Sequence, residues 1–184
     1  AVGAAAAVPS ASASAVSQSV VVTTDLVKAT LASSGGSVTH LELLRQVDQF
    51  DRSKNVVVLD QSAKRLYVAQ TGLVPPAGGA GLPNHHTPMT LVPGELTLKD
   101  GATELQVKFE SADVGGVKLI KTYTFKRGDY VIGVRHEVVN NSGAAIDPRL
   151  YLQLVRDGNA PEGESSFYFT FTGPALYTDA SKFQ

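Results

Sequence analysis

The 184-residue chain contains no cysteine. This absence excludes disulfides, thiolate nucleophiles, cysteine-ligated zinc and iron–sulfur clusters, although it leaves the redox compartment open. Long apolar runs are missing too, and none approaches the roughly 18 residues that a membrane-spanning helix requires. A chain of this length buries roughly 70% of its unfolded surface, so the sequence predicts one domain with one hydrophobic core.

An excess of charge of one sign is also missing. The 16 Lys and Arg residues nearly balance the 17 Asp and Glu residues, which gives a formal net charge of −1. The basic residues are scattered along the chain, whereas nucleic-acid-binding proteins gather them in patches or stripes. We therefore expect no nucleic-acid partner.

The first 19 residues, Ala1–Ser19, consist almost entirely of alanine, serine, valine, glycine and proline. Such a composition buries too little apolar surface to offset the entropy lost on ordering. A signal peptide is the alternative, but the stretch has no basic start, no initiating methionine and no strong apolar centre. The sequence predicts a flexible linker over residues 1–19 and a single domain over residues 20–184.

After Ser19, apolar and polar residues alternate, and turn residues interrupt the alternation about every 8 to 12 residues, as in sandwiches and barrels. The clearest segment is Glu104–Glu110, in which every second residue is apolar. This alternation is typical of a half-buried strand. The same pattern predicts three further core-facing rows: Val27, Ala29 and Leu31; Leu150, Leu152 and Leu154; Phe167, Phe169 and Phe171. The expected fold class is all-β.

The segment Val117–Val139 predicts a long β-hairpin that turns at Lys126–Asp129. The register that places Phe125 opposite Tyr130 gives one largely apolar face. It also pairs Tyr123 with Ile132, Lys121 with Val134, Leu119 with His136, Val117 with Val138 and, on the other face, Lys118 with Glu137.

Glycine and proline mark the turns between the strands. Gly35 and Gly36 are expected to end an early strand, Asp100 and Gly101 to join two strands, and Asn140–Gly143 to follow the long hairpin. The segment Thr71–Pro93 is rich in both residue types, so we expect a long irregular surface loop there.

The four histidines are the first candidates for acid–base or metal chemistry. His85 and His86 are adjacent in the predicted loop, and the sequence identifies no third ligand beside them. His136 lies on the apolar face of the hairpin, where a hydrogen-bonded core histidine is expected. His40 receives no role.

Other catalytic signals are weak. The carboxylates Glu42, Glu137 and Glu162 cannot be paired across a cleft from sequence alone. The glycines of 78–81 follow two prolines and open no helix, so they predict a flexible loop and not a phosphate site. No serine nucleophile motif is present. We predict no catalytic, cofactor-binding or metal-binding residues, and therefore no enzyme.

The aromatic row Phe167, Phe169 and Phe171 is expected to belong to the core. A groove for a peptide or a lipid is the alternative, and an exposed edge strand could also accept an extended peptide by strand addition.

Several segments resemble the large periplasmic domain of the YidC (OxaA) family, the inner-membrane insertases of Gram-negative bacteria. The most specific is Lys121–Tyr130, KTYTFKRGDY, which is close to the family's KTF.LKRGDY hairpin. The resemblance continues in Val22–Asp25, Leu31–Gly36, Gln70–Leu73, Glu104–Val107, and Phe171–Ala175 with Tyr177. The Ala- and Ser-rich start is similar to the tether that follows the family's first transmembrane helix.

The resemblance implies a twisted antiparallel β-supersandwich, similar in fold to galactose mutarotases, that is truncated at its C-terminal end. It assigns structural roles, none of them catalytic, to the family-motif residues Asp25, Gly35, Gly36, Gly72, Lys126, Arg127, Gly128, Asp129, Tyr130 and Gly173.

In function, the resemblance implies a noncatalytic, monomeric accessory domain on the periplasmic side of the inner membrane. Its parent would insert and fold inner-membrane proteins with or without the Sec translocon. The implied partners are Sec translocon components, including SecDF, and nascent membrane proteins. A carbohydrate-binding or mutarotase-like sandwich is the alternative, because fold does not determine function.

Overall fold

The structure is a computed structural model of the chain, and it describes residues 18–159, 173 and 175. These residues form ten β-strands and no helix. The strands are β1 (Ser19–Thr23), β2 (Val27–Ala32), β3 (Ser37–Val47), β4 (Asn55–Gln61), β5 (Leu66–Val74), β6 (Met89–Leu91), β7 (Glu104–Ser111), β8 (Val117–Lys126), β9 (Ile132–Asn140) and β10 (Arg149–Arg156). The expectation of an all-β protein is confirmed.

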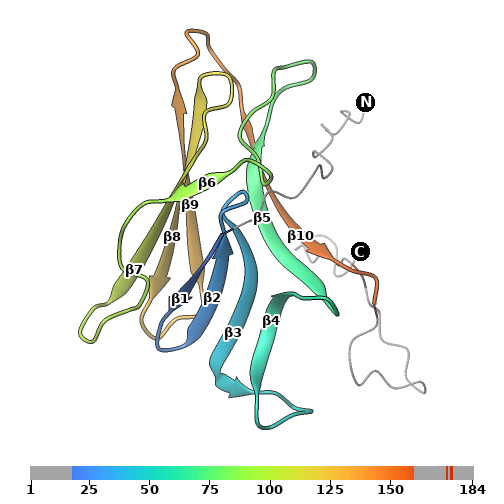
Figure 1. Cartoon of the computed structure of the whole chain (residues 1–184), viewed down its shortest axis with the longest axis vertical. Coiled ribbons are helices and arrows are strands. Elements are labelled where there is room, and N and C mark those ends of the chain that lie inside the picture. Colours follow the sequence, from blue (N-terminus) through green and yellow to red (C-terminus); the bar gives the residue numbers. More distant parts are fainter. Residues whose placement is uncertain (1–17, 160–172, 174, 176–184) are drawn as a thin grey trace, which may run out of the picture.

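The strands form two antiparallel sheets that face each other (Figure 1). The six-stranded sheet has the order β1-β2-β3-β4-β5-β10, and the four-stranded sheet has the order β6-β7-β8-β9. Short β6 connects the two layers, because Met89 pairs with Ser111 of β7 on one side while its backbone N–H donates to Ser33 O at 2.7 Å on the other. The arrangement is that of a β-sandwich; the likeness to galactose mutarotases stays a prediction.

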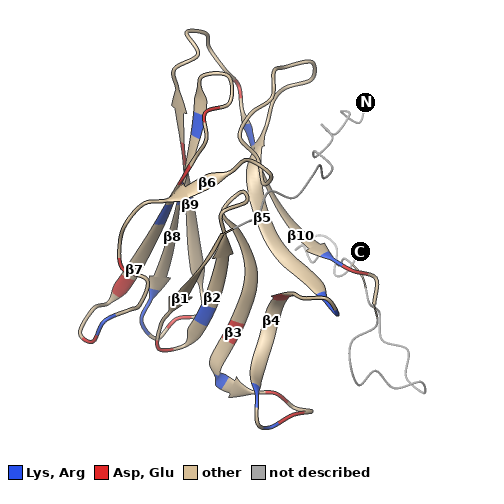
Figure 2. Cartoon of the chain, in the orientation of Figure 1, with Lys and Arg blue, Asp and Glu red and all other residues tan. Residues whose placement is uncertain are grey.

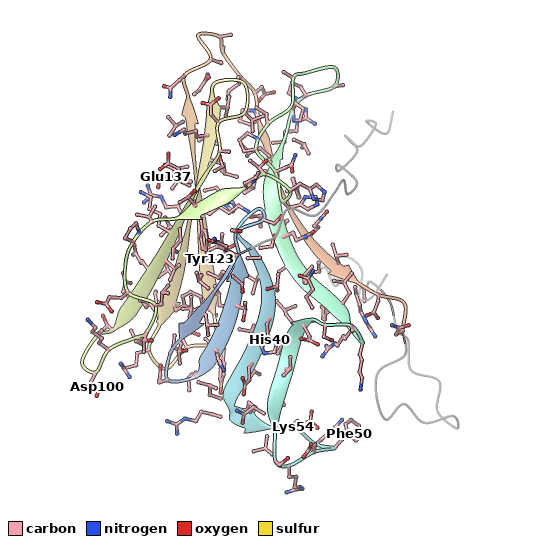
Figure 3. All side chains as sticks on the ribbon, in the orientation of Figure 1. His40, Phe50, Lys54, Asp100, Tyr123 and Glu137 are labelled. Atoms are coloured by element: carbon pink, nitrogen blue, oxygen red, sulfur yellow. The ribbon has the colours of Figure 1, made fainter. Side chains whose placement is uncertain are left out.

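The core lies between the sheets, where the alternating rows of the sequence meet. In β7 the side chains of Leu105, Val107 and Phe109 are buried while those between them point outward, as the alternation predicted. The row Val27, Ala29 and Leu31 of β2 supplies the facing side, and all of these residues belong to one apolar cluster. Figure 3 shows Tyr123 of β8 in the same interior space.

The predicted turns at Gly35–Gly36 and Asn140–Gly143 are confirmed. Gly35 and Gly36 have φ angles of 62° and 59° between β2 and β3, a conformation that favours glycine. After β9, the side-chain Oδ1 of Asn140 accepts a hydrogen bond from Ser142 N at 3.0 Å. Both turns therefore follow ordinary turn chemistry.

The long hairpin exists, but its predicted register is wrong by two residues. Phe125 pairs with Ile132 and not Tyr130, so Tyr123 meets Val134, Lys121 meets His136, Leu119 meets Val138 and Val117 meets Asn140. The connection is longer than expected because residues 127–131 form an irregular loop, in which Asp129 Oδ1 accepts from Val131 N at 3.0 Å. A two-residue shift preserves the face of every side chain, so the apolar face was predicted correctly.

The predicted pair of Lys118 and Glu137 is also wrong. Lys118 lies opposite Val139 on β9, and its ammonium group instead reaches Glu110 of β7 at 2.8 Å. The corrected register therefore moves this ion pair to the other neighbouring strand.

The predicted loop Thr71–Pro93 is only partly irregular. Its first four residues, 71–74, belong to β5, where they pair with β10, and 89–91 form β6. Glycine at position 72 did not prevent strand formation, because β10 supplies the pairing that the local sequence does not reveal.

The leucine row of β10 does not pack into the core of the described residues. Leu150, Leu152 and Leu154 are 57%, 72% and 60% exposed, so this part of the core prediction is wrong for the described structure. The aromatic row Phe167, Phe169 and Phe171, as well as Glu162, lies outside the described residues.

Truncating the core at its centre should be costly. Phe109 is 1% exposed, so we expect Phe109→Ala to lower the free energy of unfolding by about 3 to 5 kcal/mol. Phe50→Ala is the matched control, because Phe50 is 63% exposed at the tip of the β3–β4 hairpin (Figure 3) and should change stability by less than about 0.5 kcal/mol. Denaturant unfolding measures both changes, and equal losses would contradict this description of the core.

Candidate functional site

The most unusual group in the described structure is the buried side chain of Lys121. The residue occupies an inward position on β8, between the buried side chains of Leu119 and Tyr123, and it is 0% exposed. Its ammonium group donates hydrogen bonds to the backbone carbonyls of Gly35 at 2.5 Å and Thr71 at 2.7 Å. Lys121 therefore joins the four-stranded sheet to both the β2–β3 turn and β5.

Two neighbours of Lys121 make similar contacts. The hydroxyl of Tyr123 donates to the carbonyl of Gly36. His136, directly opposite Lys121 on β9, places Nε2 2.8 Å from the hydroxyl oxygen of Thr71. We name Gly35, Gly36, Thr71, Lys121, Tyr123 and His136 the Lys121 cluster.

Burial controls the protonation of this cluster. It lowers the pKa of Lys121 to about 7, and it lowers the pKa of His136 to about 4 with the help of the nearby Lys121 charge. Burial also raises the pKa of the Tyr123 hydroxyl far above its usual value. At neutral pH the His136 ring is therefore uncharged, and its hydrogen bond to Thr71 is one between neutral groups.

A second buried contact holds the β5–β6 connection against the sheet. His85 is 5% exposed, although the sequence placed it in a surface loop. Its ring nitrogen Nδ1 is hydrogen-bonded to the hydroxyl of Tyr151 on β10, and its backbone N–H donates to the same oxygen at 3.1 Å. Burial, followed by the charges of His86 and Lys121, lowers the pKa of His85 to about 4.

Two motif glycines make these contacts sterically feasible. A Cβ atom at Gly72 would lie 2.6 Å from the Tyr151 hydroxyl oxygen and 2.7 Å from Asn84 Cα. A Cβ atom at Gly35 would lie 2.3 Å from the carbonyl oxygen of His85. Both positions therefore require glycine so that the β5–β6 connection can approach the sheet.

The other motif residues lie mainly at the opposite end of the sandwich. Asp25, in the β1–β2 turn, accepts a hydrogen bond through Oδ2 from the backbone N–H of Gly128 at 3.0 Å. The Arg127 guanidinium donates to the carbonyls of Ala102 and Lys99, both at 2.8 Å. The hydroxyl of Tyr130 accepts from Gln46 at 3.3 Å. These residues connect loops from both sheets.

The last three motif residues make no such connection in the described structure. Lys126 pairs with Glu104 across β7 and β8, Asp129 shapes its own loop, and Gly173 lies at an exposed bend. The structure thus divides the predicted motif residues between the two ends of the sandwich instead of bringing them into one site.

The described contacts of these residues are hydrogen bonds within the domain. Lys121 faces carbonyl groups, and the described partner of His136 is a hydroxyl. His40 Nδ1 lies 3.2 Å from Asp60 Oδ1, a contact between β3 and β4 that the sequence did not reveal. Among the residues with a described position, no group of three or more His, Asp or Glu side chains could hold a metal ion.

The central residue of the site could have been suspected from the sequence. A lysine in the alternating apolar row of 117–125 was visible, but the register assigned it only a position and no role. Its acceptors are 86 and 50 residues away in the chain, so no local pattern could identify them.

These features define a class of protein: an antiparallel β-sandwich domain whose buried polar groups hold its own layers and loops together. The described part contains no helix long and apolar enough to cross a membrane. Acidic and basic residues are distributed over both sheets in the ribbon of Figure 2.

Comparison with known proteins identifies the family. The family model described as "YidC periplasmic domain" matches residues 19–184. The chain belongs to this family. The resemblance based on Lys121–Tyr130 is therefore confirmed.

Full-length relatives agree with this assignment. The chain is 49% identical over 168 residues to the membrane protein insertase YidC of Janthinobacterium sp. (strain Marseille), covering 91% of this chain and 29% of the relative. It is 48% identical over 178 residues to the protein of the same name from Herminiimonas arsenicoxydans, covering 96% and 30%. It is 48% identical over 168 residues to the Bordetella pertussis protein of the same name, and this match covers 91% of this chain and 29% of the relative. The chain thus spans less than a third of each relative's length.

The close approach at Gly72 can be tested by adding one methyl group. We expect Gly72→Ala to destabilise the protein by about 1 to 3 kcal/mol, because the new Cβ atom would overlap Tyr151 and Asn84. Gly81→Ala is the control, since a Cβ atom there meets nothing within 4 Å. Thermal or denaturant unfolding compares the two, and equal stabilities would show that the connection moves freely away from β5.

The depressed histidine pKa values predict acid sensitivity. His85 and His136 have a pKa of about 4 when folded, against 6.5 as the ordinary value. Between these limits the unfolded chain binds protons that the folded chain does not, so the free energy of unfolding should decrease as the pH falls from 6.5 to 4. Denaturant unfolding across this range measures the slope.

The double variant His85→Gln, His136→Gln supplies the comparison. Its free energy of unfolding should change less steeply with pH between pH 4 and 6.5 than that of the unmodified chain. Between pH 7 and 9 the two free energies of unfolding should run parallel, because both histidines are neutral there in the folded and unfolded states. Two parallel curves below pH 6.5 would rule out a buried neutral state for these rings.

Proposed function

We propose that this chain is a noncatalytic accessory domain on the periplasmic side of an inner-membrane insertase, whose whole polypeptide inserts and folds membrane proteins. One observation carries the proposal: the periplasmic-domain match over residues 19–184, together with relatives named membrane protein insertase at 48% to 49% identity. Because the chain spans only 29% to 30% of these relatives, we assign insertion itself to the rest of the protein.

The accessory role is supported by the chemistry of the Lys121 cluster. A catalytic lysine or histidine must reach a substrate, but Lys121 is fully enclosed and donates to two backbone carbonyls. His136 faces Thr71, and the described residues offer it no carboxylate of the kind that orients a catalytic histidine. This arrangement also gives no specific support to a mutarotase-like activity.

The proposed partners are components of the Sec translocon, including SecDF, and emerging segments of membrane proteins, with the domain itself monomeric. The nearly balanced charge and the scattered charged residues favour contacts through shape, apolar side chains or backbone over electrostatic attraction (Figure 2). Such contacts suit a module that supports insertion without performing it.

Replacing residues 20–184 of the parent with a Gly/Ser linker of similar reach tests the accessory role. We expect insertion of a dependent client membrane protein to be largely retained, because the proposal assigns insertion itself to the rest of the polypeptide. Protease protection of the client in cells measures insertion. The control is the unmodified parent at matched expression and membrane placement. Complete loss of insertion under these conditions would contradict the proposal.

A further inference from the structure

One end of the sandwich carries large apolar side chains that face solvent. They lie on the β3–β4 hairpin and on the β8–β9 loop, and they are 40% to 69% exposed: Val47, Phe50, Tyr130 and Val131. The two loops belong to different sheets, but Gln46 donates a hydrogen bond to the Tyr130 hydroxyl at 3.3 Å and joins them. We name the segments 45–54 and 126–131 together the hairpin end.

A third loop braces both segments of the hairpin end. Asp25, in the β1–β2 turn, accepts a hydrogen bond from the backbone N–H of Gly128 at 3.0 Å, and its carbonyl oxygen accepts one from Arg45 at 3.5 Å. The β3–β4 hairpin extends beyond the neighbouring strands (Figure 1), and Phe50 lies at its tip (Figure 3). The exposed apolar side chains therefore project from a supported part of the fold.

The basic and acidic residues of the hairpin end differ in their surroundings. Its five basic residues are all exposed: Arg45, Arg52, Lys54, Lys126 and Arg127. Its three acidic residues each accept a backbone N–H of their own loop: Asp48 from Phe50 at 2.8 Å, Asp51 from Ser53 at 3.0 Å and Asp129 from Val131 at 3.0 Å. Asp51 also pairs with Lys54 at 2.7 Å. Five basic against three acidic residues leave this end positive, whereas the whole chain has a net charge of −1.

Apolar side chains that project among exposed cations match the surface of a lipid bilayer. Aromatic and aliphatic groups bind at the boundary between headgroups and acyl chains, and Lys and Arg beside them bind anionic headgroups. A bilayer receives projecting side chains singly, whereas a stable protein interface needs a contiguous area of about 800 Å² per partner. The chain belongs to the periplasmic-domain family of an inner-membrane insertase, so a bilayer surface is present beside it.

We propose that the hairpin end docks on the periplasmic surface of the inner membrane, with Phe50 and Val131 among the lipid headgroups and the basic residues against anionic lipid. Docking would hold the sandwich in one orientation, with the β1–β2 turn toward the lipid and the Lys121 cluster at the end away from it. The inference goes beyond the proposed function, because it rests on the family assignment and not on the accessory role.

Sedimentation with vesicles of phosphatidylcholine and phosphatidylglycerol tests the docking. Millimolar lipid is used, because a domain held beside the bilayer by its parent needs only weak affinity. We expect the 184-residue chain to bind these vesicles, and less so at higher salt. The double variant Phe50→Ala, Val131→Ala should bind at least about five-fold more weakly, since it loses both apolar contacts. Absence of binding, or equal binding to vesicles of phosphatidylcholine alone, would overturn the proposal.

The double variant Val21→Ala, Val139→Ala is the matched control. Both valines are exposed, at 44% and 37%, and they lie outside the hairpin end on β1 and at the far end of β9. Their replacement should leave vesicle binding unchanged, and denaturant unfolding should show the same midpoint for both double variants. Equal loss of binding in the two double variants would contradict a specific role of the hairpin end.

A tryptophan reporter identifies lipid as the partner, because the chain contains no tryptophan. In Phe50→Trp, vesicles should shift the fluorescence to shorter wavelengths, and brominated lipids should quench it. Val139→Trp should show neither change. Equal quenching at the two positions, or none at residue 50, would overturn the proposal. So would a photo-reactive group at position 50 of the full-length parent that cross-links in cells to one protein and not to lipid.

Discussion

The hydrogen bonds from Lys121 to the carbonyls of Gly35 and Thr71 hold the four-stranded sheet to both the β2–β3 turn and β5. Removing an ammonium group from water is costly, and only good hydrogen-bond geometry offsets that cost. The two carbonyls supply it, and Tyr123 bonds the adjacent carbonyl of Gly36. The β2–β3 turn must then keep both of its glycines in the left-handed conformation to present these oxygens inward.

Close contacts also link the β2–β3 turn to β10 and back to β5. Gly35 lies against the backbone of His85, and His85 is held by Tyr151 of β10. Tyr151 in turn lies over Gly72 of β5, one residue from the Thr71 carbonyl that Lys121 uses. One end of the sandwich is therefore a closed series of contacts, and the motif glycines Gly35 and Gly72 occur where a Cβ atom would overlap a neighbouring residue.

The sequence predicted the strands better than their partners. Alternation located β7, the inward row of β2 and both faces of the β8–β9 hairpin, because side-chain period depends on the strand itself. It missed the register, since a loop shaped by Asp129 and Gly128 added two residues to the connection. It also missed the strand character of residues 71–74 and the burial of His85, because β10 creates both from far along the chain. The role of Lys121 was hidden because its acceptors, the carbonyls of Gly35 and Thr71, are 86 and 50 residues away in the chain.

The order of contacts along the chain has a consequence for how this domain folds. Strands β7, β8 and β9 pair with their immediate neighbours in sequence, so this meander needs only short loops to close. The acceptors of Lys121 are 86 and 50 residues away and belong to the other layer. Contacts between distant residues form late because of their loop entropy, so the lysine loses its water only when the layers dock. Dehydration of one ammonium group thereby becomes part of the kinetic barrier to assembling the sandwich.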